Sequence, residues 1–110
     1  MNTGAMIPAS TKGKGINLAG TQPTVYNKIL TTNGTEYSQA LPLNTTRFTL
    51  QARTAVDVKL CYTASGSGTT YLTVKSGSSY TEENIDCKDI TLYMQAGSDG
   101  IVVEIVTWSV

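Results

Sequence analysis

The feature that most constrains the fold is a regular alternation of apolar and polar residues between positions 47 and 62. In "RFTLQA" the apolar residues are Phe48, Leu50 and Ala52, and "VDVKLCY" repeats the pattern at 56, 58, 60 and 62. A period of two puts every second side chain on one face of a β-strand, whereas a helix needs a period of 3.6. The sequence therefore predicts two strands with one buried face each, and it leaves the purpose of the charged face open.

Similar short runs follow one another along most of the chain. Groups of turn-forming residues such as "ASGSG", "SGSS" and "GSDG" separate them at a spacing of roughly ten residues, and no segment shows a helical period. This pattern predicts an all-β single domain over residues 23–110, a β-sandwich or jelly-roll-like barrel of about seven short strands. The expected strands are 24–30, 35–41, 46–52, 55–63, 69–75, 90–96 and 101–110.

Turn chemistry and burial also predict which strands are neighbours. Asn33-Gly34 favours a hairpin that joins 24–30 to 35–41, because both residues tolerate positive φ. "GSDG" is expected to be a second hairpin loop, between 90–96 and 101–110. The last run is apolar on both faces, so it is either central in the fold or covered on one face by a partner. One face carries Ile101, Val103 and Ile105, and the other carries Val102, Val106 and Trp108.

The segment 79–89 is irregular, and Thr81 to Asn84 is expected to form a single helical turn with Thr81 as its N-cap. Four carboxylates in this segment could coordinate Ca²⁺, but their spacing matches no EF-hand loop and a lysine lies among them. A solvated acidic loop is therefore favoured. The four residues are Glu82, Glu83, Asp86 and Asp89.

The two cysteines, Cys61 and Cys87, could form one disulfide. Cys61 falls at the polar positions of its expected strand. The N-terminus lacks the apolar core of a signal peptide and no apolar run reaches the ~20 residues of a membrane helix, which predicts synthesis in the cytosol. Two free thiols are therefore favoured over a disulfide.

Residues 1–22 are expected to form a flexible N-terminal arm, because glycine and proline interrupt them and their apolar residues have no period. A frayed terminus and an arm that becomes ordered on a partner are both consistent with this composition. In the second case the arm contacts the partner through apolar anchors and two lysines. These residues are Ile7, Lys12, Lys14, Ile16 and Leu18.

The composition argues against several functions. The chain has no histidine, which removes the commonest general base and metal ligand, and its cysteines lack zinc-site spacing. Eight basic and eight acidic residues cancel, so no charge pattern predicts a nucleic acid or an anionic membrane as partner. The glycine-rich segments "KGKG" and "GSGTTY" lack the Gly-Lys-Ser/Thr sequence and the strand-to-helix setting of a phosphate-binding loop. We therefore expect no enzyme activity, no metal and no cofactor.

The aromatic residues permit a different function. Exposed aromatic rings on a β-sandwich are a common arrangement in carbohydrate-binding modules and adhesins, although tyrosine also occupies half-buried strand positions with its hydroxyl in solvent. A saccharide-binding surface is thus an alternative to a structural role. The candidates are Tyr26, Tyr37, Tyr62, Tyr71, Tyr80, Tyr93 and Trp108.

From about Leu43 to Trp108 the chain resembles small structural proteins of tailed bacteriophages. The resemblance covers roughly 60% of the chain, leaves out the arm, and rests on "FTLQAR", "VDVKLCY", "YLTVKSGSSYTEEN", "LYMQAGSDG" and "VVEIVTW". It implies a virion component made in the host cytoplasm, most often a capsid decoration (cement) protein. A tail or head-tail accessory protein is the alternative in the same class.

A structural role would explain the charged face of the segment 47–62. A decoration protein binds a lattice of identical major capsid protein subunits, and clustering as a homotrimer raises its avidity without new contacts. Under this hypothesis Arg47, Arg53, Asp57 and Lys59 lie on a partner-facing sheet surface, where Arg47, Arg53 and Lys59 contact the partner. A plainly solvated face is the alternative.

Overall fold

The computed structural model describes residues 22–83, 85 and 89–110. Within this part of the chain there are eight strands and no helix, which confirms the all-β prediction. Seven of the eight lie where alternation predicts them, although most are shorter than expected. The strands are β2 (Gln22–Leu30), β3 (Tyr37–Ala40), β4 (Thr45–Ala52), β5 (Val58–Cys61), β6 (Leu72–Val74), β7 (Ser79–Glu82), β8 (Thr91–Ala96) and β9 (Ile101–Ser109).

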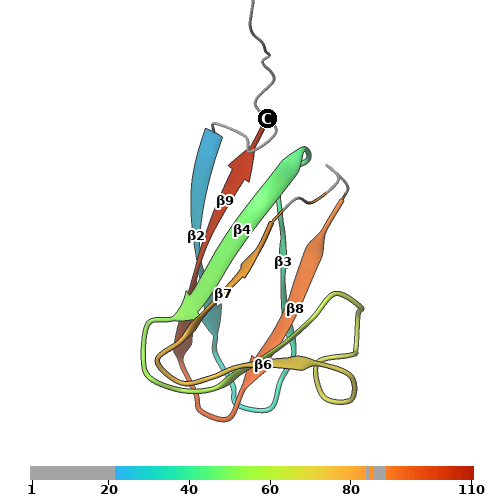
Figure 1. Cartoon of the computed structure of the whole chain (residues 1–110). Coiled ribbons are helices and arrows are strands. Elements are labelled where there is room, and N and C mark those ends of the chain that lie inside the picture. The colour runs from blue at the N-terminus through green and yellow to red at the C-terminus, as the bar shows by residue number, and fades with distance from the viewer. Residues whose placement is uncertain (1–21, 84, 86–88) are drawn as a thin grey trace, which may run out of the picture.

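The strands form two antiparallel sheets of four, in the orders β2-β9-β4-β7 and β3-β8-β5-β6 (Figure 1). The pairing is nested along the sequence, because β2 pairs with β9, β3 with β8, β4 with β7 and β5 with β6. Two further pairings, β4 with β9 and β5 with β8, complete the sheets. Successive strands of the chain therefore often lie in different sheets.

The core lies between the two sheets, where each sheet contributes the apolar half of its alternating strands. Phe48 and Leu50 of β4 are fully buried, as are Leu60 of β5 and Met94 of β8. In β9 the residues Ile101, Val103 and Ile105 face this core, and the strand is central in its sheet as its two apolar faces predict. The alternation between positions 47 and 62 is thus confirmed as a pattern of buried core residues.

Both predicted hairpins are wrong. β2 and β3 lie in different sheets, and so do β8 and β9. Gly34 has a positive φ of 69° but Asn33 does not, so the two-residue hairpin turn does not form. β2 instead pairs with nine residues of the apolar strand β9, a longer register than the four-residue strand β3 offers. The loops that follow β2 and β8 nevertheless meet each other, since Gly100 N donates to Thr31 O at 3.0 Å.

The expected helical turn at 81–84 is also wrong for its described residues. Thr81 and Glu82 belong to β7, which pairs with β4 in a register that places Tyr80 opposite Leu50. β7 supplies hydrogen-bonding partners along the edge of β4 that does not pair with β9. This long-range pairing therefore outweighs the local helix-capping pattern. Asn84 lies outside the described residues.

The predicted arm lies almost entirely outside the described residues. Its expected contact residues are among those not described: Ile7, Lys12, Lys14, Ile16 and Leu18. Gln22, the last residue assigned to the arm, is the first residue of β2. Across the described ranges, no helix is long and apolar enough to cross a membrane.

Candidate functional site

The sheet β2-β9-β4-β7 has an outer face that points away from the core, and its side chains follow from the strand register. Pro23, Trp108 and Arg47 form a row across β2, β9 and β4, and equivalent rows lie further along the sheet. We call this surface the outer face. Its residues are Pro23, Val25, Asn27 and Ile29 of β2, Val102, Glu104, Val106 and Trp108 of β9, and Arg47, Thr49 and Gln51 of β4.

Apolar side chains dominate the β2 side of the outer face. Val25 is 67% exposed and Ile29 is 54% exposed, opposite Val106 and Val102 of β9. Among the described strands, β2 is also an edge strand over its nine residues. Large exposed apolar side chains on an edge strand favour contact with another protein, because water solvates them poorly.

Arg47 and Trp108 form the most specific contact of the outer face. The guanidinium carbon lies 4.1 Å from the centroid of the indole, and the two residues are opposite in register. The Nε atom of Arg47 is buried and has no hydrogen-bond partner among the described residues. A cation over an indole gains about 0.5–2 kcal/mol, whereas a buried donor without a partner costs about 1–3 kcal/mol. The pair therefore adds little to stability.

A polar row crosses the middle of the outer face. Glu104 accepts hydrogen bonds from Arg53 Nε at 2.9 Å and from Gln51 Nε2 at 3.1 Å. These bonds, the one from Arg53 foremost, hold the pKa of the Glu104 carboxyl below its ordinary value. Because the Arg53 side chain is 53% exposed, the ion pair contributes little to stability and mainly fixes orientation.

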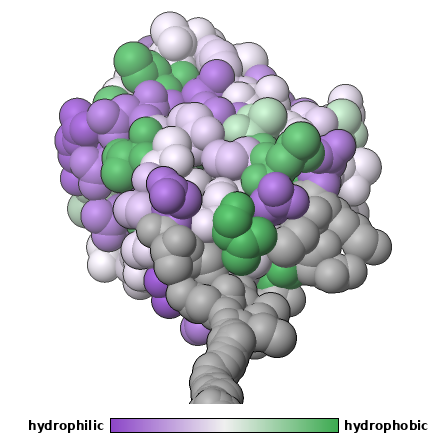
Figure 2. All heavy atoms as spheres, turned by 90° about the horizontal axis from the view of Figure 1, so that it is seen from above, coloured by the Kyte–Doolittle hydropathy of each residue, from purple (hydrophilic) through white to green (hydrophobic). Residues whose placement is uncertain are grey.

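Further exposed apolar residues lie at the end of the molecule where β9 ends and β4 begins. Leu43 is 67% exposed and Val110 is 56% exposed, and Val110 N donates to Asn44 O at 3.1 Å. Figure 2, which views the molecule from above, shows green apolar residues separated by hydrophilic ones. These residues are scattered, which is ordinary for a protein surface.

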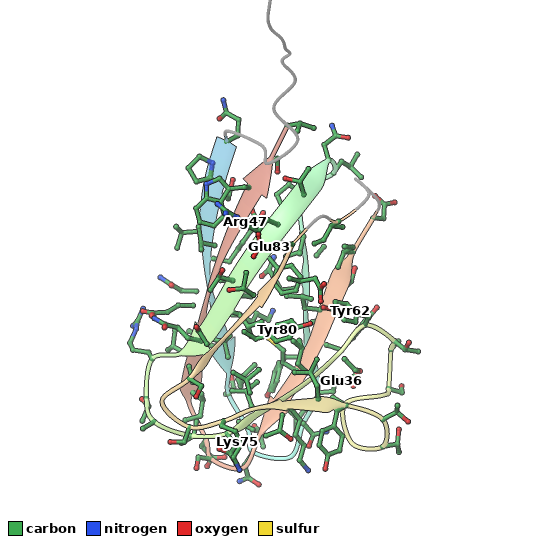
Figure 3. The ribbon with its side chains drawn as sticks, in the orientation of Figure 1. Glu36, Arg47, Tyr62, Lys75, Tyr80 and Glu83 are labelled. Atoms are coloured by element: carbon green, nitrogen blue, oxygen red, sulfur yellow. The ribbon has the colours of Figure 1, made fainter. Side chains whose placement is uncertain are left out.

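The charged residues predicted to share one surface lie on two. Arg47 lies on the β4 side of the outer face (Figure 3). Arg53 follows the end of β4 and bonds to Glu104 of the same face, whereas Lys59 is on β5 in the other sheet. There Lys59 Nζ is 4.8 Å from the centroid of the Tyr71 ring, and Asp57 accepts from Ser76 N at 2.7 Å. The prediction of a single charged surface is wrong, because the segment 53–57 crosses from one sheet to the other.

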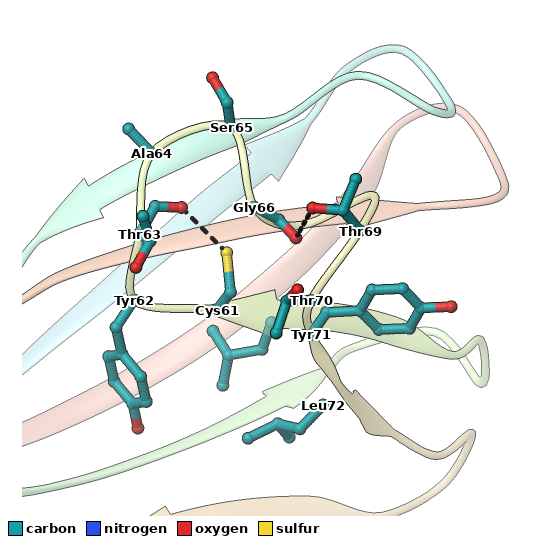
Figure 4. Close-up of a pocket in the computed structure, with 11 residues that line it drawn as sticks. Cys61, Tyr62, Thr63, Ala64, Ser65, Gly66, Thr69, Thr70, Tyr71 and Leu72 are labelled. Atoms are coloured by element: carbon teal, nitrogen blue, oxygen red, sulfur yellow. Dashed lines mark hydrogen bonds between the residues drawn. The ribbon is translucent and has the colours of Figure 1, made fainter.

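A pocket lies at the other sheet, inside the loop 62–71 that joins β5 to β6 (Figure 4). Its volume is about 650 Å³. We call it the loop pocket. The sequence suggests only a flexible loop here, and no local motif marks the pocket. Its lining residues are Leu60, Cys61, Tyr62, Thr63, Ala64, Ser65, Gly66, Thr69, Thr70, Tyr71 and Leu72.

A carboxylate from a distant turn holds this loop in place. Glu36 accepts hydrogen bonds from Ser65 N at 2.7 Å, from Ser67 N at 3.0 Å and from Ser67 Oγ at 2.5 Å. Gln95 Nε2 in turn donates to Ser67 Oγ at 3.0 Å, and Ser67 is fully buried. The bonds from Ser67, followed by the one from Ser65, lower the pKa of the Glu36 carboxyl because they favour its charged form.

The folded loop also explains why Cys61 is buried although it lies on the polar side of its strand. Its side chain lies at a polar position of the alternation, yet the residue is only 7% exposed. The thiol donates to Thr63 O at 3.1 Å, and Gly66 packs over the sulfur. Cys87 lies outside the described residues.

The two most exposed aromatic residues stand at the ends of this loop, where Tyr62 is 44% and Tyr71 is 42% exposed. The Tyr62 ring meets Phe48 edge-on, with centroids 6.4 Å apart. Tyr80 lies beside Tyr62 and its hydroxyl donates to Glu82 (Figure 3). Burial, followed by the neighbouring Tyr80 hydroxyl, raises the pKa of Tyr62. The pKa of Tyr80 is raised chiefly by its bond to Glu82.

The other predicted aromatic candidates are half-buried: Tyr26, Tyr37, Tyr80, Tyr93 and Trp108. Within the described part of the chain, no cluster of three or more potential metal ligands occurs. Of the acidic segment, Asp86 is not described, while Glu82 bonds to Tyr80 and Glu83 and Asp89 are exposed.

Comparisons with known proteins identify no family. No family model matches the chain, and no curated protein matches it. A solved structure that does match is the solution NMR structure of a de novo designed double-stranded β-helix. The two sequences are 21% identical, the match covers 79% of this chain and 97% of the designed one, and the TM-score is 0.45. A likeness at this level carries no argument about function.

Proposed function

We propose that this chain is a structural protein of a bacteriophage virion, and specifically a decoration protein that binds and stabilises the head lattice. Its partner would be the major capsid protein, and it would act as a homotrimer or similar oligomer. The single observation that carries the proposal is the outer face, where Trp108 and Arg47 lie beside the exposed Val25 and Ile29.

The composition of the outer face supports a protein partner. Tryptophan and arginine are the residue types that most often dominate binding energy at protein interfaces. Val25 and Ile29 are more than half exposed, so covering them would remove apolar area from water at about 25 cal/mol per Å².

The strand order supports the finer fold assignment. Nested pairing of eight strands into two sheets of four is the pattern of a jelly roll, an architecture that viral capsid domains and lectins share. We therefore assign the fold as a jelly-roll sandwich. Because this fold serves several functions, it supports a virion role only together with the outer face and the sequence resemblance.

Co-sedimentation tests the proposal. The full chain is mixed with empty heads assembled from the major capsid protein encoded in the same genome, and the bound fraction is measured. We expect saturable binding with a fixed stoichiometry. The double variant Val25→Ser/Ile29→Ser should bind at least about tenfold more weakly, a loss of 1.4 kcal/mol or more.

Leu43→Ser is the matched control, because Leu43 and Val25 are equally exposed at 67% and Leu43 lies off the outer face. This variant should bind like the original chain. If Leu43→Ser loses binding and the double variant does not, the outer face is not the contact surface. If the original chain ignores heads but co-sediments with assembled tails, the tail or head-tail accessory role replaces decoration.

A further inference from the structure

We propose that the loop pocket binds a neutral saccharide, a function separate from attachment through the outer face. The pocket lies at the β5–β6 end of the other sheet, and none of the residues that line it belongs to the outer face. Both activities can therefore operate in one molecule. The ligand class follows from the size, lining and rigidity of the pocket.

The size and polar lining suit a small sugar. A volume of about 650 Å³ lies within the usual range for small-ligand sites, about 300–1,000 Å³. No side chain lining it carries a formal charge at neutral pH, which disfavours an ionic ligand. A hydroxyl group both donates and accepts hydrogen bonds, as sugar hydroxyls do. The lining hydroxyls belong to Thr63, Ser65, Thr69 and Thr70.

The apolar lining suits the carbon face of a sugar ring. Tyr62 and Tyr71, which are 44% and 42% exposed, stand at opposite ends of the loop (Figure 4). The face of an aromatic ring carries partial negative charge, so it attracts the weakly positive C–H groups of a sugar. The ammonium group of Lys59 lies against Tyr71 and restricts the position of that ring.

The loop is held in shape before any ligand arrives. Glu36 binds it at Ser65 and Ser67, and Gly66 O accepts hydrogen bonds from Thr69 N at 3.0 Å and Thr70 N at 2.9 Å. A pre-organised site loses less conformational entropy on binding than a loop that must first become ordered. This rigidity favours a ligand site over a solvated connection.

A proline-rich peptide is the main competing ligand, because such peptides also bind beside tyrosines. Peptides of this kind lie along an extended groove of parallel aromatic rings. Here the rings of Tyr62 and Tyr71 point to opposite sides of the loop, and hydroxyl groups lie between them (Figure 4). This arrangement favours a compact, hydroxyl-rich ligand.

NMR titration of the ¹⁵N-labelled full chain tests the inference. Cellotriose, maltotriose, mannotriose and chitotriose are added separately, and a proline decamer is added as the competing class. We expect at least one trisaccharide to shift the amide signals of residues 62–71 with a Kd of about 1 mM or tighter. The amide signals of β2 should not move.

Tyr71→Ala is the test variant, and Val25→Ala, on the outer face, is its control. The first should weaken the binding at least about tenfold and the second should leave it unchanged. The inference is overturned if no trisaccharide shifts these signals at about 20 mM, if the proline decamer alone shifts them, or if Tyr71→Ala binds normally. A loss of head binding by outer-face variants would not change the saccharide titration of the loop pocket. Either proposal can therefore be refuted without refuting the other.

Discussion

Replacing Gly66 by alanine tests how tightly the loop pocket is packed. A Cβ atom added at Gly66 would lie 3.0 Å from Thr63 O and 3.1 Å from Cys61 Sγ. Both distances are shorter than ordinary contacts, and the first is to a backbone atom that moves only with the loop. Gly66 does not have a positive φ, so the expected strain comes from crowding and not from backbone conformation.

Two opposing effects determine how much Gly66→Ala changes the free energy of unfolding. Overpacking a tightly filled site costs about 1–3 kcal/mol, whereas replacing glycine by alanine at a compatible position gains about 0.4–1 kcal/mol by restricting the unfolded chain. The expected net effect of Gly66→Ala is a loss of about 1 kcal/mol in the free energy of unfolding. For a domain of this size that corresponds to a decrease in Tm of about 4–8 °C.

Gly97→Ala is the matched control, because nothing lies within 4 Å of its added Cβ and its φ is not positive. This variant should show only the stabilisation that comes from restricting the unfolded chain. Gly97→Ala should therefore raise Tm, whereas Gly66→Ala should lower it. Thermal unfolding followed by circular dichroism measures both. Equal shifts of the same sign would refute the argument that the loop is packed against Cys61.

Two further predictions follow from Glu36 and Phe48. The lowered pKa of Glu36 means that its bonds to the loop stabilise the fold above the ordinary pKa of a glutamate and are lost as pH falls through the lowered value. The amide signals of Ser65 and Ser67 should therefore titrate with a midpoint below that ordinary value, and Glu36→Gln should abolish the titration; a midpoint at or above the ordinary value would contradict this. Phe48 is fully buried against Tyr62 and Tyr80, so Phe48→Ala should lower the free energy of unfolding in urea by about 3–5 kcal/mol. A loss below about 1 kcal/mol would mean that the core does not pack around this ring.

The positions of most strands were predictable because a period of two is a local property. Phe48 and Leu50 can be assigned to the buried face of β4 from the residues next to them in the sequence. The partners of each strand were not predictable in the same way, since nested pairing brings β2 to β9 across most of the chain. Turn residues such as Asn33-Gly34 favour a local hairpin, and the longer register with β9 outweighs that preference.

The loop pocket was not predictable from the sequence because the residue that shapes it is remote. "ASGSG" has the composition of a flexible linker, and the carboxylate of Glu36, about thirty residues earlier, binds its backbone at Ser65 and Ser67. Nothing in the spacing of Glu36 and Ser67 marks them as partners. Tyr62 and Tyr71 were both among the aromatic candidates, but the sequence does not separate them from the half-buried tyrosines.

On the outer face, the fold explains some of the side chains of β9 and β4 and leaves others unexplained. Val102 and Val106 need no functional explanation, because β-branched residues favour strands whichever face they occupy. Trp108 and Arg47 differ, since neither belongs to the core and the buried Nε of Arg47 has no hydrogen-bond partner in the part of the chain that the structure describes. A smaller polar pair would serve the sheet equally well without that cost. The Arg47–Trp108 pair is therefore the part of this surface that the requirements of the fold do not explain.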